Sequence, residues 1–150
     1  MEIQEYFQIL RNIEEILIDF LDEENNSSIG FQEIIKANNL SAKKSDLIEI
    51  LRLITKVANN HTRTPNFSSK IQEILLFLKD KIISNFSNSE IFQIFKSNKR
   101  ILLFLYEEKI LIPDQSIADS LTTSNFKQKK YIYYFYPELK SFYNDKILKN

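Results

Sequence analysis

The sequence has very few of the residues that make tight turns, and it has no cysteine or tryptophan. Its 150 residues include one glycine and three prolines. Sandwiches, barrels and doubly wound folds normally need many more of both, so the composition argues against these folds. The missing cysteines exclude disulfides, thiol nucleophiles, cysteine-based zinc sites and iron–sulfur clusters. Because Gly30 is the only glycine, glycine-rich phosphate loops and the nucleophile elbow are excluded as well.

Neither sign of charge is in excess, but the charges are unevenly distributed along the chain. Twenty Lys and Arg balance twenty Asp and Glu. Residues 1–24 contain eight acidic residues and one basic residue, Arg11, whereas residues 125–150 contain six lysines and two acidic residues. This polarity could steer a partner or orient head-to-tail contacts, although solvated helix faces of unequal sign would give the same pattern.

Long hydrophobic runs are also missing. The longest, Ile101 to Tyr106, is far shorter than the roughly 20 residues of a membrane-spanning helix. Met1 is followed directly by acidic and amphipathic residues, without the basic and then apolar regions of a signal peptide. These features predict a cytoplasmic protein that has no membrane partner.

What the sequence does contain is apolar residues at spacings of three and four, which predicts an all-α fold of seven or eight helices. The clearest apolar stripe lies in residues 2–24 and comprises Ile3, Tyr6, Phe7, Leu10, Ile13, Leu17, Phe20 and Leu21. The other predicted helices cover residues 31–37, 45–59, 67–84, 88–95, 99–109, 114–121 and 138–148. We expect these helices to stack as degenerate pairs, in a solenoid-like arrangement or an irregular bundle.

Capping residues mark the starts of two of these helices. Ser45 is the predicted N-cap of the helix that follows it, with Asp46 in the first turn. Ser87 and Glu90 have the spacing of a capping box. The helix at residues 99–109 is apolar on nearly every side, which predicts a central position.

A five-residue string occurs twice. Ile74–Leu78 has the same sequence as Ile101–Leu105, 27 residues later. Such self-similarity is typical of stacked helix pairs, although coincidence in a chain rich in Ile, Leu and Phe would explain it too. We predict one helical domain over residues 1–150, with acidic helices in 1–60, central helix pairs in 61–124 and a basic, aromatic tail in 125–150.

No set of side chains has the spacing of a catalytic or metal site. The single histidine, His61, has no second His or Cys to act with it. The acidic residues within 19–24 and at 107–108 lack the alternating ligands and central glycine of an EF-hand loop. We therefore expect a protein that is not an enzyme and that has no catalytic, cofactor-binding or metal-binding residues.

The tail combines basic and aromatic residues. Lys127, Lys129 and Lys130 precede the aromatic-rich string 131–136. Basic residues beside stacking platforms are typical of single-strand nucleic-acid surfaces, but the neutral net charge and acidic N-terminal half weaken that interpretation. Docking of aromatic side chains onto a helical core explains the same residues. Nucleic-acid binding by the tail is therefore the alternative function.

Residues 86–111, with the sequence FSNSEIFQIFKSNKRILLFLYEEKIL, resemble the helical N-terminal region of a large family of protist ankyrin-repeat proteins. Residues 16–25, 66–82 and 136–140 fit the same region. The resemblance implies a helical module that precedes ankyrin repeats, binds protein partners or caps the array, and has no catalytic residues. The chain itself has no Thr-Pro-Leu-His string and no consensus ankyrin repeat. We thus expect a protein-interaction module that uses either the acidic first helix or the last helices with their Lys/Tyr-rich tail.

Overall fold

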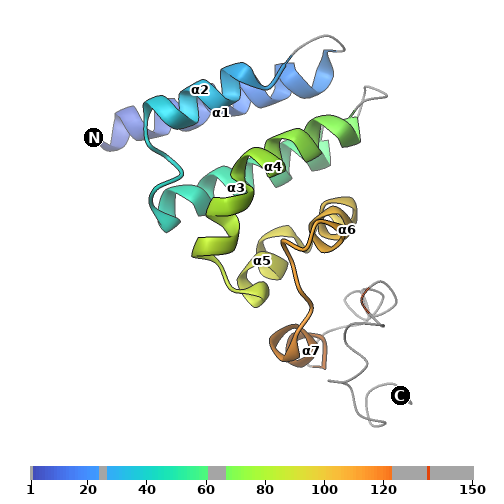
Figure 1. Cartoon of the computed structure of the whole chain (residues 1–150). Coiled ribbons are helices and arrows are strands. Elements are labelled where there is room, and N and C mark those ends of the chain that lie inside the picture. The colour runs from blue at the N-terminus through green and yellow to red at the C-terminus, as the bar shows by residue number, and fades with distance from the viewer. Residues whose placement is uncertain (1, 24–26, 61–66, 123–134, 136–150) are drawn as a thin grey trace. The chain divides into compact units, whose positions relative to one another are not determined.

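A computed structural model describes residues 2–23, 27–60, 67–122 and 135, apart from the side chains of 67 and 120–122 (Figure 1). These residues contain no strand, which confirms the predicted all-α class. The described helices are α1 (Ile3–Asp22), α2 (Ile29–Ala37), α3 (Lys44–Asn60), α4 (Phe67–Asn85), α5 (Asn88–Phe95), α6 (Lys99–Glu107) and α7 (Gln115–Thr122). The predicted helix at 138–148 lies outside the described residues.

The chain divides into two compact units, Met1–Asn85 and Phe86–Asn150. The boundary lies between α4 and α5, and it coincides with neither of the expected subdivisions at residues 60 and 124. The organisation of the whole chain as one domain stays a prediction.

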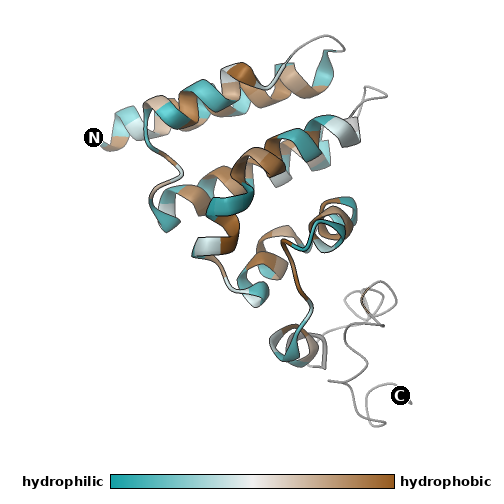
Figure 2. Cartoon of the chain, in the orientation of Figure 1, coloured by the Kyte–Doolittle hydropathy of each residue, from teal (hydrophilic) through white to brown (hydrophobic). Residues whose placement is uncertain are grey.

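Unit 1 consists of two antiparallel helix pairs, α1 with α2 and α3 with α4, and α1 contacts both members of the second pair (Figure 1). Figure 2 shows hydrophobic and hydrophilic residues alternating along each helix, as amphipathic helices require. Apolar residues at helical spacing within 45–59 and 67–84 predict one buried face on each of α3 and α4, and the structure confirms both faces. Their buried members are Leu47, Ile50, Leu51, Ile54, Ala58, Ile71, Ile74, Leu75, Leu78 and Ile82.

The buried side chain of Lys70 connects α4 to the end of α1. The Lys70 ammonium donates hydrogen bonds to the backbone carbonyls of Phe20 (2.5 Å) and Glu23, and it lies 5.2 Å from the centre of the Phe20 ring. The last carbonyls of a helix lack partners within the helix and carry its negative dipole charge. Because α1 has no basic residue in its own last turn, Lys70 supplies the positive charge there.

The starts of α2 and α3 differ from the prediction. Residue Ile29 begins α2, two residues before the expected Phe31, because the carbonyl of buried Ser28 already accepts a helical hydrogen bond from Gln32. The prediction that Ser45 is the N-cap of α3 is wrong. The carbonyl of Lys43 accepts the first helical bond of α3, from Leu47, and Ser45 therefore lies inside the first turn.

Unit 2 packs α5 against α6 and α7. The predicted capping box of α5 is confirmed, since the Ser87 hydroxyl accepts from the Glu90 N–H (3.2 Å) and the Glu90 carboxylate accepts from the Ser87 N–H (3.0 Å). Helix α6 buries Ile101, Leu102, Phe104 and Leu105, whereas Leu103 is half-buried. Leu103 is thus not fully covered, although the sequence predicts a central position for this helix.

Candidate functional site

The structure describes only some of the residues that the sequence singled out for chemistry. His61 and the tail lysines 127, 129 and 130 lie outside the described residues. Asp19, Asp22 and Glu23 lie at the end of α1. Within the part of the chain that the structure describes, no three His, Cys, Asp or Glu residues are grouped so that they could hold a metal ion.

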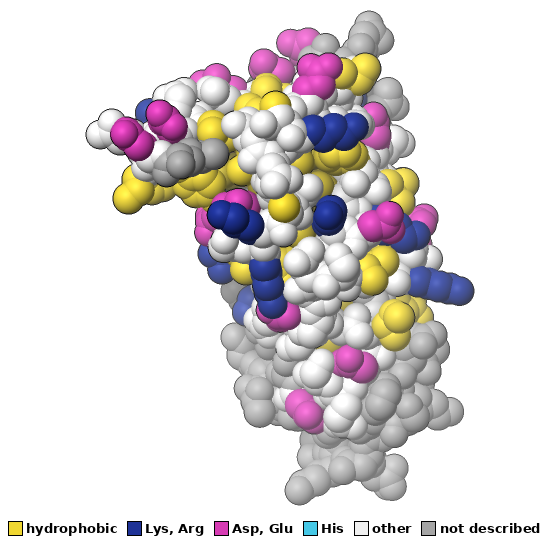
Figure 3. All heavy atoms as spheres, turned by 60° about the vertical axis from the view of Figure 1, so that its left-hand side comes forward, with side chains coloured by type: hydrophobic (Ala, Val, Ile, Leu, Met, Phe, Trp, Pro, Cys, Tyr) yellow, Lys and Arg dark blue, Asp and Glu magenta, His cyan; other side chains and the backbone are white. Residues whose placement is uncertain are grey.

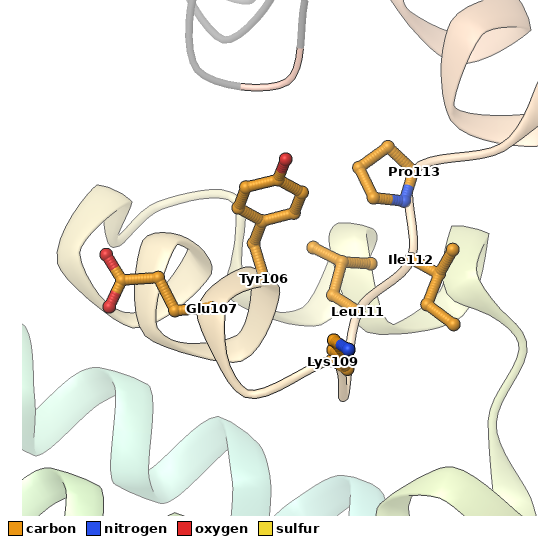
Figure 4. A pocket seen from close by; sticks show the side chains of 6 residues that line it. All are labelled: Tyr106, Glu107, Lys109, Leu111, Ile112 and Pro113. Atoms are coloured by element: carbon orange, nitrogen blue, oxygen red, sulfur yellow. The ribbon is translucent and has the colours of Figure 1, made fainter. Parts of the chain in front are cut away.

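A pocket of about 370 Å³ lies in unit 2, at the end of α6 and the loop that follows it (Figure 4). Figure 4 shows the Tyr106 ring and Pro113 on either side of Leu111, with the Glu107 side chain pointing away from them. The described side chains that line it come from one short segment: Tyr106, Glu107, Lys109, Leu111, Ile112 and Pro113. They combine a carboxylate, an ammonium group and a phenol with three apolar side chains.

Tyr106 also packs against one residue of the tail, Phe135. The Phe135 ring is fully buried and meets the Tyr106 ring edge-on, with 5.3 Å between ring centres. Aromatic docking onto the helical core is therefore observed at Phe135. The rest of the aromatic string 131–136 lies outside the described residues.

The first two turns of α1 expose large apolar side chains. Ile3 is 73% exposed and Phe7 is 55% exposed. Their neighbours Tyr6 and Leu10 are half-buried, and the centres of the Tyr6 and Phe7 rings are 6.2 Å apart. Figure 3 shows hydrophobic side chains gathered at this projecting end of the molecule, on the upper left, with acidic side chains beside them. We call Ile3, Tyr6, Phe7 and Leu10 the α1 edge.

Helix α2 does not cover the α1 edge. Ile16, the residue of α1 against which α2 packs, is nine residues after Phe7 and therefore lies about 180° around the helix from it. Helix α1 has 20 residues and is about 30 Å long, whereas α2 has 9 residues and is about 14 Å long. Gly30 of α2 lies against Ile16, with 3.7 Å between a Cβ position at residue 30 and the Ile16 Cγ2. The two helices are antiparallel, so Ala37 at the end of α2 comes level with about Ile9. Nothing in α2 reaches Ile3 or Phe7.

Carboxylates lie beside the α1 edge. The pKa of the Tyr6 hydroxyl lies above its ordinary value. Burial is the largest cause, followed by the negative charge of Asp46, a hydrogen bond to the Asp46 side chain and the negative charge of Glu49. About two helical turns after Tyr6, Glu14 forms an ion pair with Lys56 of α3 (3.1 Å). Among the described residues, neither Glu2 nor Glu5 takes part in an ion pair.

The other exposed apolar side chains are more scattered. They are Ile29 on α2, Leu76 and Ile83 on α4, and Ile112 in unit 2. Leu76 and Ile83 are two helical turns apart, whereas Ile3 and Phe7 are one turn apart and continue into Leu10. In the described part of the chain, the α1 edge therefore offers the most closely grouped apolar contact area.

The sequence analysis placed all four residues of the α1 edge on one apolar stripe, and the structure shows that Ile3 and Phe7 on this stripe are exposed. Helical periodicity could not separate them from the buried members, because it does not show which part of a stripe a neighbouring helix covers.

Comparison with known proteins gives no relative, since no family model, curated protein or solved structure matches this chain. Within the described residues, no helix combines the length and the hydrophobicity that crossing a membrane requires. The resemblance to the N-terminal region of ankyrin-repeat proteins stays a prediction.

Proposed function

We propose that this chain is a non-enzymatic protein-interaction module, located in the cytoplasm, and that it binds a partner protein through the α1 edge. The observation that carries the proposal is the exposure of Ile3 and Phe7 on a stripe whose later members form the core of unit 1. An exposed group of large apolar side chains rimmed by polar residues is typical of protein-binding surfaces. The absence of cysteine from the sequence agrees with the cytoplasm.

The energetics favour Phe7 as the principal anchor. Complete burial of one large apolar side chain contributes about 1.5–3 kcal/mol. Aromatic anchors of this kind account for much of the affinity of protein interfaces. Phe7 is already supported by the neighbouring Tyr6 ring, so less side-chain freedom is lost when a partner covers it.

The capping role implied by the ankyrin resemblance concerns the opposite end of the chain. Residues 123–134 and 136–150 lie outside the described residues, and Ile112 is the exposed large hydrophobic residue in the described part of unit 2. Capping of a following ankyrin array therefore stays a prediction, and the proposed surface is the α1 edge.

Site-specific photo-crosslinking tests the proposal. We would place a photo-reactive phenylalanine analogue at Phe7 in one variant and at Leu76 in a matched control, then irradiate each in an extract of the cells that express the protein. We expect a discrete crosslinked protein from residue 7, and its loss when Ile3→Ser is added. Equal crosslinking from residues 7 and 76 would contradict the proposal. Circular dichroism would check that both variants keep the helical fold.

A further inference from the structure

We infer that the α1 edge binds a second copy of this chain, with the two α1 helices antiparallel across a two-fold axis, and this inference rests on the proposed function. Two observations carry it. The row of side chains that contains Ile3 and Phe7 continues into an exposed cation, Arg11. The charges around this row are nearly balanced.

Arg11 extends the exposed row of α1 by one turn. Ile3, Phe7 and Arg11 follow one another at spacings of four, so their side chains lie in one row along the helix. All three are exposed. Among the described residues, the Arg11 guanidinium takes part in no ion pair, hydrogen bond or ring contact. The row therefore presents an uncovered aromatic ring and an uncovered cation, one helical turn apart.

A ring and a cation in one row complement each other when two copies meet in opposite directions. In a two-fold interface both copies use the same surface, and each contact occurs twice. An axis midway between residues 7 and 11 places Phe7 of each copy between the partner's Leu10 and the partner's Arg11. The guanidinium of each copy then lies over the Phe7 ring of the other, where it is attracted to the face of the ring. Each copy thus supplies what the other lacks.

The charges around the row permit two copies to meet. Residues 2–15 of α1 and its start, and residues 43–56 of the neighbouring α3 and its start, contain six acidic and five basic residues. Two pairs of these charges already neutralise each other within the chain, Glu14 with Lys56 (3.1 Å) and Glu49 with Arg52 (3.4 Å). A surface with so small a net charge does not strongly repel its own copy. It also lacks the positive charge that attracts anionic membranes.

The size of the row predicts a weak dimer. The distance along α1 from Ile3 to Arg11 is about 12 Å. Standard protein interfaces use about 20–30 residues on each side, which is many more than this row contains. We therefore expect monomers and dimers to exchange rapidly, with dimers populated at high protein concentration.

Sedimentation velocity of the full chain over a series of concentrations tests the inference. We expect a monomer–dimer equilibrium whose Kd rises at least about tenfold for Phe7→Ser and about fivefold for Arg11→Gln, since each substitution removes two symmetric contacts. The Kd should not change for the matched control Leu76→Ser. Because Arg11 is exposed, Arg11→Gln keeps the fold, which circular dichroism would check.

Thiol crosslinking tests the antiparallel arrangement, and the chain has no cysteine of its own to interfere. Gln4 and Glu15 are exposed on the same side of the row, near its opposite ends. In the antiparallel dimer Gln4 of one copy lies nearly level with the partner's Glu15. A mixture of Gln4→Cys and Glu15→Cys chains should therefore crosslink faster with a short bismaleimide than either variant alone.

The outcomes separate this inference from the proposed function. A chain that sediments as a monomer at every concentration, while residue 7 still crosslinks to a different protein, would overturn the inference and leave the proposed function intact. Monomers together with no crosslinking from residue 7 would overturn both. Dimers whose Kd is unchanged by Phe7→Ser and Arg11→Gln, or faster crosslinking of either cysteine variant alone, would overturn the inference. Phe7-dependent binding of monomers to vesicles of phosphatidylserine and phosphatidylcholine would overturn it in favour of a membrane.

Discussion

At the scale of single residues, the scarcity of glycine affects how two helices end. Asn39 after α2 and Lys109 after α6 adopt left-handed backbone angles, with φ of 53° and 59°. In both cases the next residue donates to a carbonyl five positions back, Leu40 to Ile35 and Ile110 to Leu105. This is the Schellman pattern, which usually has glycine at the left-handed position. Gly30, the only glycine, has a negative φ and is not used in this way.

We predict that Lys109→Gly stabilises unit 2. A residue with a side chain is less stable in the left-handed region by about 1–2 kcal/mol, and glycine removes this strain. Part of the gain is cancelled, because glycine also has more conformational freedom in the unfolded chain. The free energy of unfolding, measured by urea denaturation, should rise by about 0.5–1 kcal/mol. Asn39→Gly should give a smaller gain, because asparagine tolerates the left-handed region better than lysine does.

The neighbouring Glu108 is the control for this substitution. Its φ is −85°, so glycine relieves no strain there, and Glu108→Gly should lower the free energy of unfolding by about 0.5–1 kcal/mol. If Lys109→Gly and Glu108→Gly lowered the free energy of unfolding equally, the backbone at Lys109 would not be strained.

At the scale of helices, sequence patterns predicted what depends on neighbouring residues and missed what depends on a partner helix. The capping box at Ser87 and Glu90 is local and was predicted correctly. The buried faces of α3 and α4 follow from helical periodicity and were predicted as well. The exposure of Phe7 and the burial of Lys70 were not predicted, because both depend on how the other helices pack around α1. The sequence did contain a signal for the burial of Lys70, since it lies four residues before Ile74 and thus on the buried face of its helix.

The start of α7 shows how one carboxylate connects three helices of unit 2. Asp114 accepts hydrogen bonds from the Ser116 N–H (3.0 Å) and hydroxyl (2.5 Å), which satisfy the first turn of α7. It also accepts from the side chain of Asn88, the first residue of α5 (3.0 Å). Asn88 in turn accepts from the Ile112 N–H (2.9 Å), in the loop after α6. Loss of the Asp114 charge should therefore weaken all three connections.

We predict a stability loss at acid pH that depends on Asp114. Burial alone would raise the pKa of this carboxyl, but hydrogen bonds from Ser116, Asn88 and Ile117 lower it below its ordinary value. A group with a lowered folded-state pKa stabilises the fold above its unfolded-state pKa, near 4, and this stabilisation is lost as pH falls through the folded value. Thermal unfolding at a series of pH values below about 5 should therefore show a smaller decline for Asp114→Asn than for the wild type.

Asp119→Asn serves as the comparison, since Asp119 lies on the same helix and accepts from the exposed Gln115 side chain (2.7 Å). The decline for Asp114→Asn should be smaller than the decline for Asp119→Asn. An unchanged decline in Asp114→Asn would mean that other carboxylates account for the acid sensitivity.

At the scale of the whole molecule, each unit has a core of its own. Leu17, Leu51 and Leu75 are completely buried within unit 1, and Phe92 and Leu105 are completely buried within unit 2. Separate cores make separate cooperative unfolding steps the expected behaviour, in which each unit opens with its own free energy. The single domain over residues 1–150 stays a prediction, because helical periodicity gives no information on which helices share a core.

We predict that core substitutions act on one unit at a time. Leu17→Ala leaves a cavity in unit 1 and Phe92→Ala leaves one in unit 2, each at a cost of about 2–5 kcal/mol. In hydrogen exchange followed by mass spectrometry, Leu17→Ala should lower the protection of α1 to α4 by about 30-fold or more and leave α5 to α7 unchanged. Phe92→Ala should give the reverse pattern. Equal loss of protection in both units from either substitution would show that the chain unfolds as one cooperative domain.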